Sequence, residues 1–186
     1  MAGLELTVSP GFLLLAASVY FAGGLGALAA LLAAALAHEL GHLAAIFMAG
    51  ASIRSLRVTV CGPVIEYGGD IGAREEMGIL AAGPIAGIFF AVLCFVTEIP
   101  FLCYTGAIAL LAALFNLLPV LPMDGGRLAQ YALNMVMPEK TAAAVLRFAG
   151  TLCALGVLAT GIYIRSVAAA AAGIWMGLLA NFPALR

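Results

Sequence analysis

The chain has 186 residues, of which 65% are hydrophobic and 9% are charged, and its formal net charge is -1 at pH 7. Globular domains carry about 25% charged residues, so this composition excludes an ordinary water-soluble protein and indicates one that resides in a lipid bilayer. The near-zero net charge and the lack of a basic run exclude nucleic acid as an expected partner. The lipid bilayer is therefore the first predicted partner.

Hydrophobic runs separated by breakers predict an all-α polytopic membrane protein. A bilayer-spanning helix needs about 20 residues, so the chain has room for about six spans. The expected spans cover about residues 10–22, 25–49, 77–96, 102–118, 142–164 and 167–182. Gly23-Gly24 separates the first two, and a short amphipathic piece at 128–137 precedes the fifth.

A more polar interval, residues 50–76, lies between the second and third spans. Within it Ser55–Val60 and Val64–Tyr67 are β-prone runs separated by a Cys-Gly-Pro turn. Such a pattern favours a small hairpin over another span.

The distribution of basic residues predicts the orientation of the spans. If the N-terminus is cytoplasmic, seven of the eight Lys and Arg residues lie on the cytoplasmic side and Arg165 alone lies on the other. The seven are Arg54, Arg57, Arg74, Arg127, Lys140, Arg147 and Arg186. We therefore expect a multi-pass protein of the cell membrane with cytoplasmic N- and C-termini and a cytoplasmic-side hairpin.

The pentapeptide His38-Glu39-Leu40-Gly41-His42 lies in the second predicted span and contains both histidines of the chain. On a helix, side chains four residues apart share one face, so both imidazoles can hold one Zn²⁺ while Glu39 accepts a proton from water. A carboxylate and two imidazoles are costly in hydrocarbon unless a metal or another partner compensates them. The pattern predicts a metalloprotease site inside a membrane.

A catalytic zinc generally has three protein ligands, so a third ligand is needed. Carboxylates are few, and Asp124 is favoured because it lies in a segment, residues 116–127, that two prolines and two glycines prevent from continuing as a regular helix. The other acidic residues considered are Glu66, Asp70, Glu75, Glu76, Glu98 and Glu139. We expect one zinc per chain, held by His38, His42 and Asp124.

The HELGH motif followed two spans later by Asn116-Leu-Leu-Pro-Val-Leu-Pro-Met-Asp124-Gly-Gly resembles the site-2 protease family of intramembrane zinc metalloproteases, peptidase family M50. The six-span layout and the residue sequence of the second motif look most like the sporulation factor IVFB branch. The likeness covers roughly residues 10–182. It implies that His38, His42 and Asp124 are zinc ligands, that Glu39 is the catalytic base, and that Asn116 acts on the substrate near the zinc.

The chain also departs from the family pattern. Gly87 stands where many members have an Asn after the Gly-Pro pair, here Gly83-Pro84, and Gly83 and Gly87 are expected to serve helix packing within the chain. We expect one membrane metalloprotease domain over 1–186, with a catalytic core at about 25–137 and neither a PDZ nor a CBS domain.

The predicted function is cleavage of a membrane-associated or membrane-tethered protein near the cytoplasmic leaflet. The resemblance suggests a transcription-factor or sigma-factor precursor as substrate and a membrane regulatory or inhibitory protein as a further partner. The run Leu56–Val60 is expected to offer a strand edge to the unwound substrate. Two alternatives are a non-proteolytic zinc-binding or transport protein, and a different membrane zinc protease with a Glu ligand on a later helix.

Overall fold

The structure is a computed structural model that describes residues 5–59 and 62–182. The chain divides into two units, Met1–Ala113 and Leu114–Arg186, which are described separately. In chain order the described elements are β1 (Glu5–Val8), α1 (Pro10–Met48), β2 (Ser52–Thr59), β3 (Gly62–Gly68), α2 (Ala73–Val96), α3 (Pro100–Asn116), α4 (Asp124–Asn134), α5 (Glu139–Tyr163) and α6 (Val167–Asn181).

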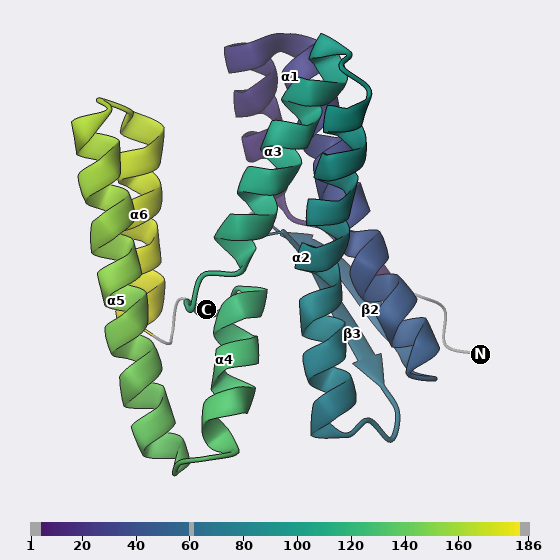
Figure 1. Cartoon of the computed structure of the whole chain (residues 1–186), viewed down its shortest axis with the longest axis vertical. Coiled ribbons are helices and arrows are strands. Elements are labelled where there is room, and N and C mark those ends of the chain that lie inside the picture. The colour runs from purple at the N-terminus through teal and green to yellow at the C-terminus, as the bar shows by residue number, and fades with distance from the viewer. Residues whose placement is uncertain (1–4, 60–61, 183–186) are drawn as a thin grey trace. The chain divides into compact units, whose positions relative to one another are not determined.

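Helix α1 contains both of the first two predicted spans. Ser9 caps its N-terminus by accepting a hydrogen bond from the Phe12 amide, and Pro10 follows at the first helical position. Its 39 residues would measure roughly 58 Å in a straight helix, far more than one bilayer needs. Gly24, at φ +73°, breaks the helix, and Figure 1 shows the bend near the purple end of α1. The predicted break at Gly23-Gly24 is confirmed.

The predicted hairpin is part of a three-stranded sheet in the order β1-β2-β3. Strands β2 and β3 are antiparallel, with Leu56 opposite Ile65. Strand β1, which the sequence reasoning missed, lies parallel to β2 with Val8 opposite Val58. Because residues 55–58 of β2 pair with β1 on one side and with β3 on the other, the expectation that Leu56–Val60 offers a free strand edge is wrong for Leu56–Val58. Thr59 pairs with Gly62 of β3, and Val60 lies outside the described residues.

Helices α2 and α3 correspond to the third and fourth predicted spans. Helix α2 packs against α1 through small residues, since a Cβ at Gly41 would overlap the Ala82 carbonyl and the Ala86 methyl group. Gly106 of α3 allows a similarly close approach to α2, where a Cβ would come within 3.0 Å of the Ala91 carbonyl oxygen. Ala34, Ala91 and Ala109 form a small core in this unit.

The second unit contains the end of α3, an irregular segment, and helices α4 to α6. Helix α4 begins at Asp124, four residues before the predicted start at residue 128, because Gly125 and Gly126 enter its first turn instead of ending a loop. Helices α5 and α6 form a closely packed pair in which Gly161 abuts the backbone of Ala170, and Gly173 abuts Leu158 (Figure 1). Val120, Ala154, Met176, Leu179 and Ala180 form the core of this unit.

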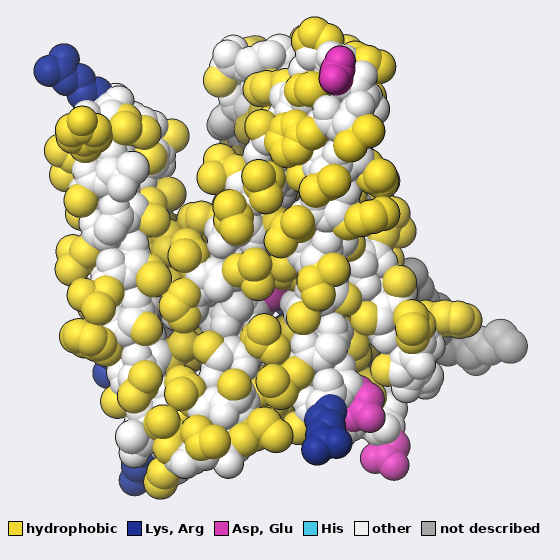
Figure 2. All heavy atoms as spheres, in the orientation of Figure 1, with side chains coloured by type: hydrophobic (Ala, Val, Ile, Leu, Met, Phe, Trp, Pro, Cys, Tyr) yellow, Lys and Arg dark blue, Asp and Glu magenta, His cyan; other side chains and the backbone are white. Residues whose placement is uncertain are grey.

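The helices have the length and surface of a membrane protein. In the described part of the chain three helices, α1, α2 and α5, are long and apolar enough to cross a bilayer, and α3 and α6 are shorter apolar helices of 17 and 15 residues. Hydrophobic side chains dominate the visible surface in Figure 2, and most of the charged groups lie near the ends of the helices. The molecule is an all-α membrane protein with a small sheet, as predicted.

Candidate metal centre

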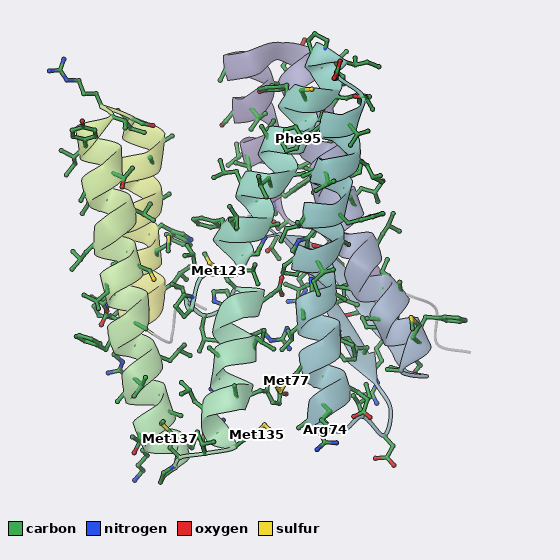
Figure 3. All side chains as sticks on the ribbon, in the orientation of Figure 1. Arg74, Met77, Phe95, Met123, Met135 and Met137 are labelled. Atoms are coloured by element: carbon green, nitrogen blue, oxygen red, sulfur yellow. The ribbon has the colours of Figure 1, made fainter. Side chains whose placement is uncertain are left out.

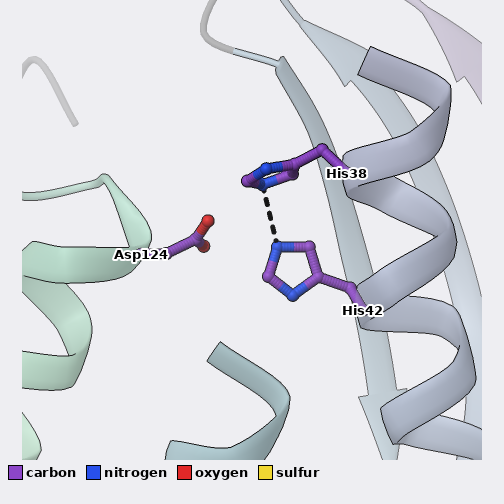
Figure 4. A group of neighbouring side chains, drawn as sticks. All are labelled: His38, His42 and Asp124. Atoms are coloured by element: carbon purple, nitrogen blue, oxygen red, sulfur yellow. Dashed lines mark hydrogen bonds between the residues drawn. The ribbon is translucent and has the colours of Figure 1, made fainter. Parts of the chain in front are cut away.

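The two histidines lie on successive turns of α1 with their rings turned toward each other. Their Nε2 atoms are 3.1 Å apart, and Figure 4 marks this contact with a dashed line. The side chains are almost completely buried, at 7% exposure for His38 and 8% for His42. The helix therefore brings two ring nitrogens to one buried point, as the four-residue spacing predicts.

A backbone carbonyl on α2 orients the second imidazole. Nδ1 of His42 lies 2.8 Å from the carbonyl oxygen of Ile79, and since a carbonyl can only accept, Nδ1 carries the proton and donates it. In the neutral ring Nε2 then has no proton, and its lone pair can bind a metal. Such outer partners hold metal-bound histidines in place in many proteins.

The spacing of the two nitrogens fits a tetrahedral zinc site. Two nitrogens each about 2.0–2.1 Å from a tetrahedral zinc lie roughly 3.3–3.4 Å from each other. The observed 3.1 Å between the Nε2 atoms is within a few tenths of an ångström of that value. Two buried imidazoles with converging Nε2 atoms are thus suited to hold zinc with little rearrangement.

Glycines on α2 provide the space that the imidazoles occupy. A Cβ at Gly83 would overlap the His42 ring, and a Cβ at Gly87 would lie 3.8 Å from Nδ1 of His38 and 3.2 Å from the Cβ of Ala113. The expected use of Gly83 and Gly87 in packing within the chain is confirmed. Their contact with the histidines was missed, although their four-residue spacing matches that of the motif. At residue 87 an added Cβ would be tight against Ala113 alone.

Glu39 and Asn116 occupy different elements. Glu39 follows His38 directly on α1 and is half-buried. Asn116 is the last residue of α3, where the helix gives way to the irregular segment, and it is also half-buried. Their predicted catalytic roles remain predictions.

Asp124 is the first residue of α4, and Figure 4 draws its side chain at the start of that helix. A carboxylate at this position is stabilised by the partial positive charge of the helix N-terminus. The residues after it permit close backbone contact, because a Cβ at Gly125 would overlap the Leu117 carbonyl and a Cβ at Gly126 would come within 2.5 Å of the Val120 carbonyl. The Gly-Gly pair therefore fixes the irregular segment against the helix that carries Asp124.

A family model and two curated relatives match this chain. The model of peptidase family M50 matches residues 96–157. Rip3 of Mycobacterium tuberculosis, named as a zinc metalloprotease, is 30% identical over 180 residues, covering 89% of this chain and 46% of the relative. Stage IV sporulation protein FB of Bacillus subtilis is 31% identical over 147 residues, covering 75% of this chain and 51% of that protein.

The fold is also similar to a solved structure. The site-2 protease from Methanocaldococcus jannaschii matches with a TM-score of 0.69 and 20% sequence identity, over 91% of this chain and 84% of that one. This likeness shows the fold. The chain spans about half the length of the curated relatives it matches. Together with the HELGH helix and its buried histidine pair, these matches support peptidase family M50 as the family of this chain.

Proposed function

We propose that the chain is an intramembrane zinc metalloendopeptidase that cleaves a membrane-associated protein. The observation that carries this proposal is the pair of buried imidazoles on α1, whose Nε2 atoms lie 3.1 Å apart while Nδ1 of His42 is held by the Ile79 carbonyl. The names of the matched relatives support zinc and proteolysis as the chemistry of this family.

We assign one zinc per chain to His38, His42 and Asp124. Two nitrogens and one carboxylate oxygen are a ligand set found in catalytic zinc sites, which keep a fourth position open. The chemistry of the donors supports Asp124, since this carboxylate begins a helix directly after the apolar segment 117–123 and is followed by glycines that fix its backbone. Zinc bound there would supply positive charge that lowers the pKa of water and polarises a carbonyl group.

Glu39 is the proposed general base and Asn116 the proposed substrate contact. A carboxylate directly beside a ligand on the same helix is well placed to accept the proton of the attacking water and to return it to the leaving amine. An amide side chain such as Asn116 can donate a hydrogen bond to the oxygen of the scissile carbonyl, where negative charge develops.

The peptide bond must be unwound before it can be cut, and its backbone groups then need partners, because each unpaired group in hydrocarbon costs several kcal/mol. Since β2 is paired on both sides, the sheet offers its outer strands, and β3 is the candidate for strand addition by the substrate. We therefore propose that the extended substrate adds along the outer edge of β3, not along Leu56–Val58.

We further propose a multi-pass protein of the cell membrane with both termini cytoplasmic and cleavage near the cytoplasmic leaflet. The seven-to-one distribution of basic residues supports this orientation. The match to stage IV sporulation protein FB supports the sporulation branch of the family. We propose, from the resemblance of the two motifs to that branch, a membrane-tethered transcription-factor or sigma-factor precursor as substrate class and a membrane regulatory or inhibitory protein as a further partner.

The test is co-expression of the chain with a library of tagged, membrane-tethered cytoplasmic reporters. Glu39→Gln is expected to lower cleavage by about 10²–10⁴-fold, because the amide has nearly the same shape but cannot accept the proton. Its zinc content should stay unchanged. Glu75→Gln, which removes an exposed carboxylate from the first turn of α2, is the matched control. Undiminished cleavage by Glu39→Gln would refute the mechanism and favour a zinc-binding or transport function.

A further inference from the structure

A groove lies along the first half of α5 in the second unit, beside the end of α6. Its volume is about 440 Å³, and its walls include Lys140, Arg147, Phe148, Thr151 and Asn181 together with two alanines. Figure 3 labels Met137 at the turn between α4 and α5, which is the end of α5 where Lys140 lies. None of these residues is used by the proposed catalytic site.

The groove is positively charged. Lys140 and Arg147 are two turns apart on one face of α5, and no acidic residue is among its described lining residues. Within the described part of the chain neither side chain has an ion-pair partner. The floor is already ordered, because Asn181 donates to the Thr151 hydroxyl at 3.1 Å and that hydroxyl donates to the Arg147 carbonyl at 2.8 Å. The two cationic side chains thus line the groove together with a hydrogen-bonded polar pair, Thr151 and Asn181.

The position of Arg147 within a membrane span calls for an anionic partner. Helix α5 has 25 residues and measures roughly 37 Å, so only its ends extend beyond a hydrocarbon core of about 30 Å. Arg147 is roughly 10 Å further along the axis than Lys140, which places its Cα inside the edge of the core. Its guanidinium can extend toward the interface, where lipid phosphates lie.

An apolar stripe continues from the groove along the same helix. Phe148, Leu152 and Leu155 are 67%, 54% and 55% exposed, at spacings that place them on adjoining turns. The surface of this helical pair in Figure 2 is mostly hydrophobic above the dark blue atoms at its lower end. A ligand with a charged head and hydrocarbon chains would match this sequence of a cationic groove followed by an apolar stripe, whereas free phosphate would leave the stripe unused.

We propose that this groove binds the headgroup of an anionic phospholipid. Lys140 and Arg147 contact the phosphate, the Thr151 and Asn181 side chains line the headgroup, and the acyl chains lie along Phe148, Leu152 and Leu155. Basic pockets between membrane helices on the side facing anionic lipids are typical sites of this kind. The inference does not depend on the proposed protease activity.

The test uses native mass spectrometry to measure the lipid that the 186-residue chain retains after extraction from bilayers of phosphatidylcholine containing phosphatidylglycerol. We expect retained phosphatidylglycerol in preference to phosphatidylcholine. Lys140→Gln and Arg147→Gln should each weaken this preference about fivefold, and together about 25-fold, the effect of roughly one surface cation each. Arg165→Gln, at the opposite end of α5, is the matched control and should change nothing.

Three results would overturn the proposal. The first is a double variant that retains phosphatidylglycerol as well as the wild type. The second is an equal loss in Arg165→Gln, which would indicate a general charge effect. The third is displacement of the lipid by inorganic phosphate at an equal concentration, which would assign the groove to a free anion. Lys140→Gln alone carries the test if the double variant does not fold, since Lys140 is exposed in the first turn of α5.

Discussion

The histidine region of α1 and the Asp124 region of α4 both depend on glycine, but for different reasons. On α1 the helix is regular and the glycines lie on the facing helix α2, where they leave room for imidazole rings. At Asp124 the glycines follow the candidate ligand directly and allow its helix to meet the backbone of the preceding segment. The histidine side chains on α1 therefore need small residues on the facing helix, whereas the Asp124 region needs small residues next to the candidate ligand in its own segment.

The largest effect is expected at Gly125, where an added methyl group would overlap backbone atoms. Gly125→Ala should destabilise the protein by at least about 1–3 kcal/mol, because the new methyl group overlaps the Leu117 carbonyl and neither backbone can move cheaply. The measurement is the thermal unfolding of the purified protein in detergent. Gly156→Ala, at a position in α5 with open space around it, should be neutral or stabilising. Equal stability of the two variants would mean that the close contact of residue 125 with the Leu117 carbonyl does not constrain the fold.

The next effect is expected at Gly83, where a side chain would displace another side chain. Gly83→Ala should lower zinc affinity about 10–100-fold, the usual cost of losing the orientation of a metal-bound histidine. Competition with a zinc chelator measures it. Gly78→Ala is the matched control on the same helix, because a Cβ there meets nothing within 4 Å. If both variants bound zinc as the wild type does, the His42 ring would not need the space at residue 83.

A smaller effect is expected at Gly87. Its Cβ would be tight against Ala113 at 3.2 Å but in ordinary contact with His38 at 3.8 Å, so Gly87→Ala should reduce zinc affinity less than Gly83→Ala does. The same chelator competition, run on both variants side by side, ranks them. A reversed order would mean that His38 is the more tightly confined of the two histidines.

The sequence was a good guide where a feature depends on residue spacing or on a local break. The histidine pair, the Gly24 break and the β2–β3 hairpin all have such local signals. Strand β1 was missed because four residues give too little alternation to predict a strand, and its parallel partner β2 is more than forty positions away. The β2 edge was misjudged for the same reason.

Features that depend on which helix faces meet could not be predicted. The carbonyl of Ile79 that orients His42 has no side-chain signal, since any residue would provide the same group. The early start of α4 was missed because two glycines normally indicate a loop, and only the contact with Leu117 and Val120 shows why a helix accepts them here.

The ligand set is the central claim, and zinc content tests it most directly. The wild type, Asp124→Asn and Glu66→Gln would be equilibrated with a buffered zinc chelator and analysed for metal per chain. We predict about one zinc per chain in the wild type and in Glu66→Gln, and a large loss in Asp124→Asn, because a neutral amide is a much weaker ligand than a carboxylate. Full zinc occupancy in Asp124→Asn together with its loss in Glu66→Gln would contradict the assignment.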